Sequence, residues 1–91
     1  MKRLTLKIRG EVQGVYFRES VVEIAKELDL VGWVRNDKDG AVSVVAEGEE
    51  NKLTELLNYC GEGPKLSVVE DVKEKWEFIN KKSFEEFKIK Y

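Results

Sequence analysis

Two hydrophobic periods alternate along the chain, and their order limits the folds that it can adopt. Residues 4–8 alternate apolar and polar side chains, which is typical of a half-buried strand. From about Arg18 to Asp29 the apolar residues follow the spacing of a helix. Val31 to Asn36 and Ala41 to Glu47 are then predicted as strands, joined by a turn that contains Asp39-Gly40. The first half of the chain therefore predicts the order strand, helix, strand, strand.

The second half of the chain adds another helix and further strands. Apolar residues at helical spacing over residues 53–60 predict the second helix, and the glycines and proline of residues 61–64 end it. A fourth strand is expected from near Leu66, with a bulge between residues 69 and 72, where the alternation of apolar and polar side chains slips. The alternating residues 87–91 predict one more strand.

The resulting order, βαββαβ with a central hairpin, is that of the ferredoxin-like fold. We therefore expect an α+β sandwich, with two helices on one face of a four- to five-stranded antiparallel sheet. Residues 1–91 are expected to form a single domain, because a chain of this length is too short for a second core. The first and second strands run in the same direction in this topology. The loop of residues 10–18 and Asn36 should therefore lie at the same end of the sheet.

The loop of residues 10–18, Gly-Glu-Val-Gln-Gly-Val-Tyr-Phe-Arg, has the character of an anion-binding site. Gly10 and Gly14 permit backbone conformations that a β-carbon forbids, so successive N–H groups can face one ligand. The N–H groups of residues 15–17 would approach that ligand at the positive end of a helix dipole. Arg18 adds a planar, permanently charged fork that matches two phosphoryl oxygens. The expected ligand is phosphate.

The chain contains no histidine and a single cysteine, Cys60. It therefore lacks the commonest general base and the commonest ligand for transition metals. One cysteine excludes an intramolecular disulfide and a multi-cysteine metal site. The net charge of −2 argues against a nucleic-acid partner, and no stretch approaches the ~20 apolar residues of a membrane span. We expect a cytoplasmic protein, and its 37 % of charged residues is typical of thermophile surfaces.

Five short motifs follow one another along the chain. They are Gly10 to Arg18, Gly32 to Asn36 (Gly-Trp-Val-Arg-Asn), Asp39-Gly40, Gly63-Pro64 and the aromatic ending Phe87 to Tyr91. The first two contain unusual residues rather than generic glycines. In this order the motifs resemble the acylphosphatases, small enzymes that hydrolyse the carboxyl–phosphate bond, whose pattern begins G-x-V-Q-G-V-x-F-R and continues with G-W-V-x-N. The resemblance covers nearly the whole chain.

The resemblance implies which residues would do the chemistry. Arg18 would bind the phosphoryl group and neutralise the charge on its oxygens. Asn36 would orient the attacking water, and because an amide cannot take a proton, the proton would pass to a phosphoryl oxygen. The expected catalytic residues are Arg18 and Asn36. The expected phosphate-binding residues are Gln13, Gly14, Val15, Tyr16, Phe17 and Arg18. No metal and no cofactor are implied.

Three of these residues also have plainer interpretations. An arginine in the first turn of a helix is usually solvated, although positive charge there is disfavoured unless an anion offsets the dipole. From spacing alone, Asn36 is interpreted as a turn residue that ends a strand. Gln13 is expected to serve the site through its backbone, while its side chain braces the loop.

The remaining conspicuous side chains are expected to be structural. Trp33 and Val34 are predicted in the core of a buried strand. Trp76 and Phe78 should pack against helices rather than stack on bases. Cys60 occupies a core position of the second helix and is expected to be inert packing.

Charged groups near the site are expected to have two different roles. The carboxylates Glu11, Asp37 and Asp39 are predicted on loop and turn surfaces. No catalytic pair is expected among them, because near a phosphate they would repel the substrate. The family-like ending suggests instead that the terminal carboxylate of Tyr91 reaches Arg18 and holds its guanidinium in place.

The predicted function is hydrolysis of acyl phosphates to a carboxylate and inorganic phosphate, which is both product and inhibitor. A free-standing, metal-free enzyme that acts as a monomer is expected. Two alternatives stay open. The same fold serves RNA-recognition and small-ligand regulatory modules, although residues 4–8 lack the exposed aromatics that RNA recognition needs. The other is a carbamoyl-phosphate-handling domain like those fused to hydrogenase-maturation proteins.

Overall fold

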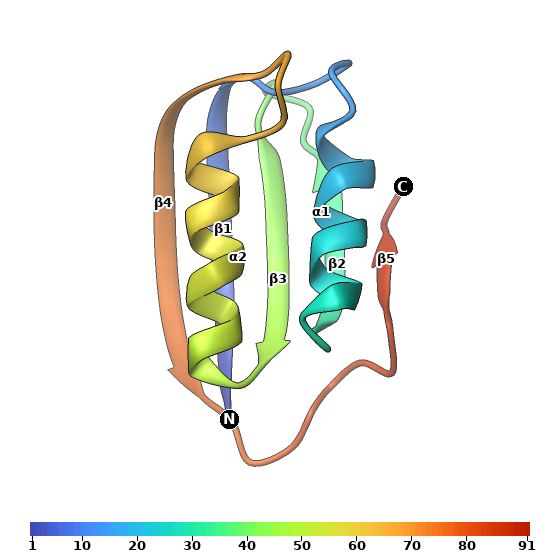
Figure 1. Ribbon diagram of the computed structural model, residues 1–91, viewed down its shortest axis with the longest axis vertical. Helices are drawn as coiled ribbons and strands as arrows, with labels where there is room; N and C mark the ends of the chain where they lie inside the picture. The colour runs from blue at the N-terminus through green and yellow to red at the C-terminus, as the bar shows by residue number, and fades with distance from the viewer.

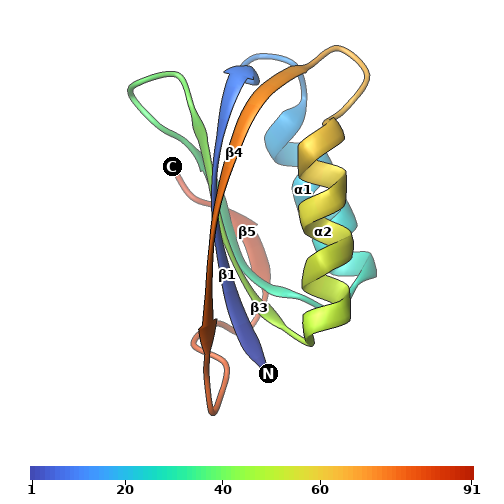
Figure 2. The same ribbon diagram turned by 90° about the vertical axis from the view of Figure 1, so that its left-hand side faces the viewer.

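The computed structural model describes residues 1–91, and its elements follow the predicted order (Figure 1). They are β1 (Lys2–Glu11), α1 (Phe17–Glu27), β2 (Val31–Asn36), β3 (Val42–Gly48), α2 (Glu50–Glu62), β4 (Val68–Phe78) and β5 (Phe87–Ile89). Both helices lie on the same face of a five-stranded sheet, which makes two layers (Figure 2). The predicted ferredoxin-like α+β fold is confirmed. Neither helix is long and apolar enough to cross a membrane.

The strands lie in the order β4-β1-β3-β2-β5. β1 pairs antiparallel with β3 and β4, and β2 pairs antiparallel with β3. β5 pairs parallel with β2, which places Phe87 opposite Gly32. The sheet is therefore mixed, and the expectation of an antiparallel sheet is wrong for this last strand. Residues 79–86 cause the difference, because they run along the lower edge of the sheet and start β5 at the end where β2 starts (Figure 1).

The path of residues 79–86 is tied to the sheet by a buried carboxylate. The Glu47 side chain has no exposed surface and accepts hydrogen bonds from the Ser83 backbone N–H and from Arg3 Nε, the latter at 2.8 Å. Arg3 Nη2 also donates to Ser83 Oγ at 3.0 Å. A buried carboxylate is costly unless it is paired and hydrogen-bonded in this way. The contact therefore fixes the segment that leads into β5.

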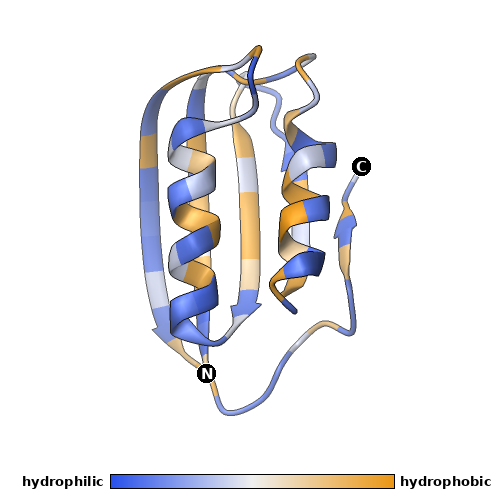
Figure 3. Ribbon diagram, viewed as in Figure 1, coloured by the Kyte–Doolittle hydropathy of each residue, from blue (hydrophilic) through white to orange (hydrophobic).

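The core lies between the sheet and the two helices. Leu4, Leu6 and Ile8 of β1 are buried there, as their alternation predicted. Figure 3 shows that β3, in the middle of the sheet, is mostly apolar, whereas the edge strand β4 is mostly hydrophilic. Cys60 is buried in the same core, and burial raises the pKa of its thiol to about 12. The thiol therefore stays protonated and packs as an apolar group, as expected.

Trp33 lies on the sheet face away from the helices, so its predicted core position is wrong. Val34 is fully buried toward the helices, and side chains alternate along a strand, so Trp33 points the other way. The Trp33 ring lies 4.9 Å from Arg35 Cζ and 4.7 Å from Lys90 Nζ. Two cations are thus attracted to the ring in a polar cluster on the open face of the sheet.

The aromatic residues of β4 differ in their packing. Trp76 is half-buried against the core, as expected, but Phe78 is 86 % exposed. Lys2 Nζ lies 5.9 Å from the Trp76 ring and 4.7 Å from the Phe78 ring. The prediction that Phe78 packs against a helix is wrong, because β4 is the outer strand and Phe78 is its last residue.

The predicted bulge is present in β4. The register of β1 against β4 shifts between Arg9 and Gly10, which leaves Glu70 as the extra residue. Gly10 has a φ of 137°, and a β-carbon there would lie 2.0 Å from the carbonyl oxygen of Val68. Only glycine allows the two strands to approach this closely. The bulge comes directly before the loop that leads into α1.

Candidate active site

A cavity of about 250 Å³ opens at the end of the sheet where β1 and β2 finish. We call it the cradle. Its lining comes from the loop between β1 and α1, the first turn of α1 and the last residue of β2: Val12, Gly14, Tyr16, Phe17, Arg18, Glu19 and Asn36. Arg18 and Asn36, which are 18 positions apart in the sequence, therefore line one cavity, as the shared direction of β1 and β2 predicted.

The backbone of the cradle presents N–H groups that the protein itself does not use. Gly14 and Tyr16 adopt left-handed conformations, with φ of 75° and 67°. A β-carbon at Gly14 would meet no atom within 4 Å. α1 begins at Phe17, and the first N–H groups of a helix have no helical acceptor. None of the N–H groups of residues 14–18 donates a hydrogen bond within the protein. Together with the helix dipole, they suit an anion.

Arg18 is the arginine that no carboxylate neutralises. Arg3, Arg9 and Arg35 each form an ion pair with a carboxylate, whereas Arg18 forms none. Its Cζ lies 5.6 Å from the centre of the Tyr91 ring. The expected ion pair with the terminal carboxylate of Tyr91 is therefore wrong, and a cation–π contact takes its place. The charge of Arg18 stays available to a ligand.

Asn36 contributes an amide without a protein partner. Its backbone is held at the end of β2, where it pairs with Val42. Its Oδ1 is buried and accepts no hydrogen bond. Most buried polar atoms are hydrogen-bonded, so an unpaired one beside a cavity marks a position where a ligand or water can bind. The interpretation of Asn36 as an ordinary turn residue does not account for this atom.

Gln13 and Val15, both expected to bind phosphate, do not line the cradle. Gln13 Nε2 donates to the carbonyl oxygens of Asp37 at 2.8 Å and Ala41 at 2.9 Å. Its side chain thus braces the loop against the β2–β3 hairpin, which carries Asn36, as the sequence suggested. Val15 is half-buried and packs against the core. Their free backbone N–H groups are what these two residues can offer to an anion.

The carboxylates of the β2–β3 turn are occupied by neighbours and lie outside the cradle lining. Asp37 is only 12 % exposed, so it is less superficial than predicted. Partial burial opposes its ionisation, but hydrogen bonds from Ser43 and Arg35 lower its pKa below the usual value. The backbone N–H of Ala41, together with basic side chains from β1, lowers the pKa of Asp39 to about 2. Both groups are ionised structural anchors at neutral pH, and no catalytic carboxylate pair is formed.

Sequence reasoning missed two lining residues, Val12 and Glu19. Val12 is buried between β1 and the cradle loop, and its position in the motif offered no chemical signal. Glu19 follows Arg18 in the first turn of α1, where an acidic side chain is favoured by the helix dipole. Its place directly after Arg18 was visible in the sequence. A carboxylate at the edge of an anion site repels additional negative charge, so Glu19 could have been recognised as a residue that affects which ligands bind.

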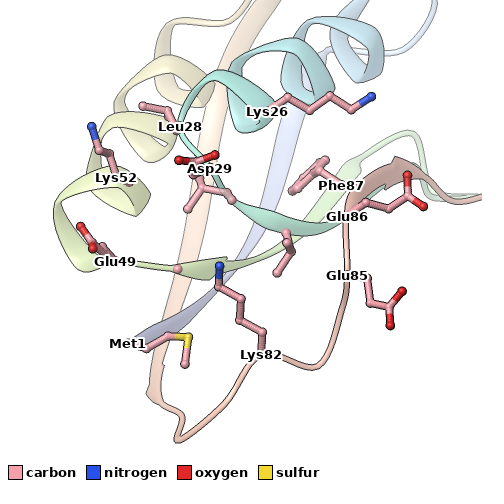
Figure 4. Close-up of a pocket in the computed structure, with 13 residues that line it drawn as sticks. Met1, Lys26, Leu28, Asp29, Glu49, Lys52, Lys82, Glu85, Glu86 and Phe87 are labelled. Atoms are coloured by element: carbon pink, nitrogen blue, oxygen red, sulfur yellow. The ribbon is translucent and has the colours of Figure 1, made fainter.

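The largest cavity, about 820 Å³, lies at the opposite end of the sheet from the cradle. It is lined by charges of both signs from the two helices and residues 79–86 (Figure 4). The ammonium groups of Lys26, Lys52 and Lys82 lie apart from one another in this view. They do not converge on one point, so the cavity lacks the arrangement of charge found in the cradle.

Comparisons with known proteins agree with the geometry. The family model described as acylphosphatase matches residues 4–89. An acylphosphatase from Marinobacter nauticus is 50 % identical over 72 residues, which cover 79 % of this chain and 78 % of that protein. The crystal structure of acylphosphatase from Bacillus subtilis is 34 % identical, with a TM-score of 0.94 and coverage of 100 % of both chains. Full-length HypF in its phosphate- and nucleotide-bound form is 30 % identical, with a TM-score of 0.88; the match covers 99 % of this chain and 12 % of that one.

Proposed function

The chain belongs to the acylphosphatase family, whose members hydrolyse the carboxyl–phosphate bond of acyl phosphates, and we propose that this reaction takes place in the cradle. Arg18 binds the phosphoryl group and Asn36 orients the attacking water. The main support for this proposal is that one cavity brings together an arginine that forms no ion pair with a carboxylate and a buried amide oxygen that accepts no hydrogen bond from the protein.

The phosphoryl group is bound by charge and by backbone donors. The guanidinium of Arg18 presents parallel N–H donors to two phosphoryl oxygens. The free N–H groups of residues 14–18 approach the remaining oxygen at the positive end of α1. In phosphoryl transfer the protein acts chiefly by positioning and by neutralising charge on these oxygens, so this set of donors can supply most of the catalysis.

The attacking water is held by the Asn36 amide. The amide oxygen accepts a hydrogen bond from the water, and the water oxygen attacks phosphorus while the bond to the acyl carboxylate breaks. The water's proton passes to a phosphoryl oxygen, because an amide cannot accept it. The products are a carboxylate and inorganic phosphate. The substrate thus serves as its own base, which explains how a chain without histidine can catalyse this hydrolysis.

Substitution of Arg18 tests the proposal. Arg18→Ala should lower kcat/KM for benzoyl phosphate by roughly 10³-fold or more and weaken inhibition by inorganic phosphate, because the backbone donors alone cannot neutralise a phosphoryl group. Arg18→Lys should recover little, because a point charge cannot reproduce the two parallel donors. Assays are run with excess chelator, and Arg9→Ala is the matched control, since Arg9 lies on the open face of the sheet and pairs with Asp39. Activity of Arg18→Ala within a fewfold of wild type would contradict the assignment.

We also propose that the enzyme acts as a monomer in the cytoplasm, without metal or cofactor, on small acyl phosphates. The residues that line the cradle all belong to this chain, so the proposed site needs no partner subunit to be complete. The ion-pair network of Lys7, Arg9 and Arg35 with Asp37 and Asp39 is of the kind enriched in thermophile proteins, which supports a thermophilic source. Sedimentation of the purified protein tests whether it is a monomer, and thermal melting tests the thermophilic source.

A further inference from the structure

A second hollow continues from the cradle between α1 and β5. This groove has a volume of about 510 Å³ and shares the side chains of Tyr16 and Glu19 with the cradle. Its walls include Val22 from α1, Ile89 from β5 and Tyr91 beyond β5. Asn36 lines the cradle but not the groove. The two hollows therefore adjoin at Tyr16 and Glu19, and the amide of Asn36 belongs to the lining of the cradle alone.

Two exposed tyrosine rings stand where the groove meets the cradle. Tyr16 is 56 % exposed and Tyr91 is 98 % exposed, although both are large and partly apolar. The Tyr16 hydroxyl donates to Glu23 Oε1 at 2.6 Å, which holds its ring along α1. The Tyr91 ring lies against the guanidinium of Arg18 at 5.6 Å. Exposed rings beside the arginine of the cradle suit a ligand that brings apolar or aromatic surface of its own.

The geometry of the reaction directs the acyl group toward this groove. In phosphoryl transfer the attacking and leaving oxygens are roughly in line with phosphorus. Water held by Asn36 therefore requires the acyl carboxylate to leave on the side away from Asn36. The groove adjoins the cradle at Tyr16 and Glu19, and Asn36 is not part of its lining. The acyl group of a bound substrate would thus lie between α1 and β5.

Charge along the groove limits which acyl groups are accepted. Glu19 lines both hollows, and Glu23 follows one turn further along α1. Two lysines also line the groove: Lys26, which follows Glu23 on α1, and Lys88, which pairs with Glu86 at 3.7 Å. Glu19 alone among these charged side chains lines both hollows, so an acyl group with its own negative charge would meet a carboxylate where the groove adjoins the cradle, and like charges at close range disfavour binding.

We propose that this groove is the acyl subsite and that it selects acyl phosphates whose acyl group is uncharged and aromatic or bulky. The inference rests on the proposed function of the cradle and adds the substrate class that the phosphate-binding motif leaves open. Tyr16 and Tyr91 are specificity-determining residues, and Glu19 selects against anionic acyl groups.

The test compares substrates that share the phosphoryl group and differ in the acyl group. The kcat/KM values of benzoyl phosphate and acetyl phosphate are measured for wild type, Tyr91→Ala, Tyr91→Phe and Phe78→Ala. In Tyr91→Ala the kcat/KM for benzoyl phosphate divided by that for acetyl phosphate should fall about three- to tenfold, as expected for loss of one aromatic contact. Tyr91→Phe retains the ring and should retain the ratio. Phe78→Ala removes another largely exposed ring, at the far end of the sheet, and should leave the ratio unchanged.

A second comparison tests the charge of the groove. Wild type should hydrolyse 4-carboxybenzoyl phosphate less efficiently than benzoyl phosphate, and Glu19→Gln should narrow that difference about threefold or more. Turnover of both substrates with unchanged ratios in Tyr91→Ala and Glu19→Gln would overturn the acyl subsite while leaving the proposed function intact. Absence of turnover with every acyl phosphate would refute the proposed function, and the subsite with it.

Discussion

Replacing Asn36 with alanine should lower turnover without lowering stability. The Asn36 Oδ1 accepts no hydrogen bond from any protein group, so alanine removes no hydrogen bond that holds the fold. The backbone pairing with Val42 also remains. The free energy of unfolding should therefore stay within about 0.5 kcal/mol of the wild-type value. For a domain of this size, that corresponds to a shift in Tm of no more than about 4 °C.

The catalytic effect of the same change should be large. Loss of one positioned polar group typically lowers kcat by roughly 10²–10³, which is about 2.7–4 kcal/mol of transition-state stabilisation. Phosphate binding depends on Arg18 and on the backbone N–H groups of the loop, which the change does not touch. The inhibition constant of inorganic phosphate should therefore change by no more than about threefold. An enzyme of unchanged stability that binds phosphate normally but turns over slowly is the expected phenotype.

Three measurements on one preparation check this prediction. They are kcat with benzoyl phosphate, the inhibition constant of inorganic phosphate and Tm by circular dichroism. Asn58→Ala provides a matched control, because Asn58 is an exposed asparagine of α2 outside the cradle lining. A fall in Tm of several degrees, together with loss of phosphate inhibition, would refute the reasoning, since it would mean that Asn36 supports the fold of the loop instead of the water.

Two further changes test the surroundings of the cradle. Gln13→Ala removes both hydrogen bonds between the loop and the β2–β3 hairpin. Tm should therefore fall by about 4–8 °C, and kcat/KM should fall by roughly tenfold because the loop is less well positioned. An unchanged kcat/KM would limit Gln13 to a stabilising role. The folded-state pKa of Asp39 is lowered to about 2, against about 3.9 in the unfolded chain. The ionised Asp39 carboxylate therefore stabilises the folded state fully above pH ~4, and this stabilisation is lost as the pH falls to ~2. Asp39→Asn should therefore melt at a lower temperature than wild type at pH 7, and the difference should vanish near pH 2; a difference independent of pH would show that ionisation of Asp39 is not its cause.

Local patterns were sufficient for most of the fold. The alternation in β1 and the helical spacing in α1 report which side of each element is buried, and that side is decided by neighbours close in sequence. The bulge near Glu70 was visible for the same reason, because an extra residue shifts the alternation within one strand. The glycines and Arg18 of the loop also carried their chemistry locally, since φ values and a helix N-terminus belong to adjacent residues.

Features that depend on distant partners were predicted less well. Trp33 was expected in the core because it is apolar, but the alternation of β2 leaves only one face for the helices, and Val34 occupies it. The parallel direction of β5 depends on the path of residues 79–86, which a contact between Glu47 and Ser83 fixes across 36 positions of sequence. The Arg18–Tyr91 contact likewise depends on where β5 ends.

The sequence by itself determined the order of the elements, the anion-binding character of the loop and the absence of an imidazole base, because each depends on residue type and short-range spacing. Tertiary structure alone decided that the Asn36 amide oxygen stays unpaired, that Arg18 has no carboxylate partner and that a groove leads from the cradle between α1 and β5. Whether a polar group is paired depends on every side chain that packing brings within reach. That set of neighbours exists only once the sheet has assembled.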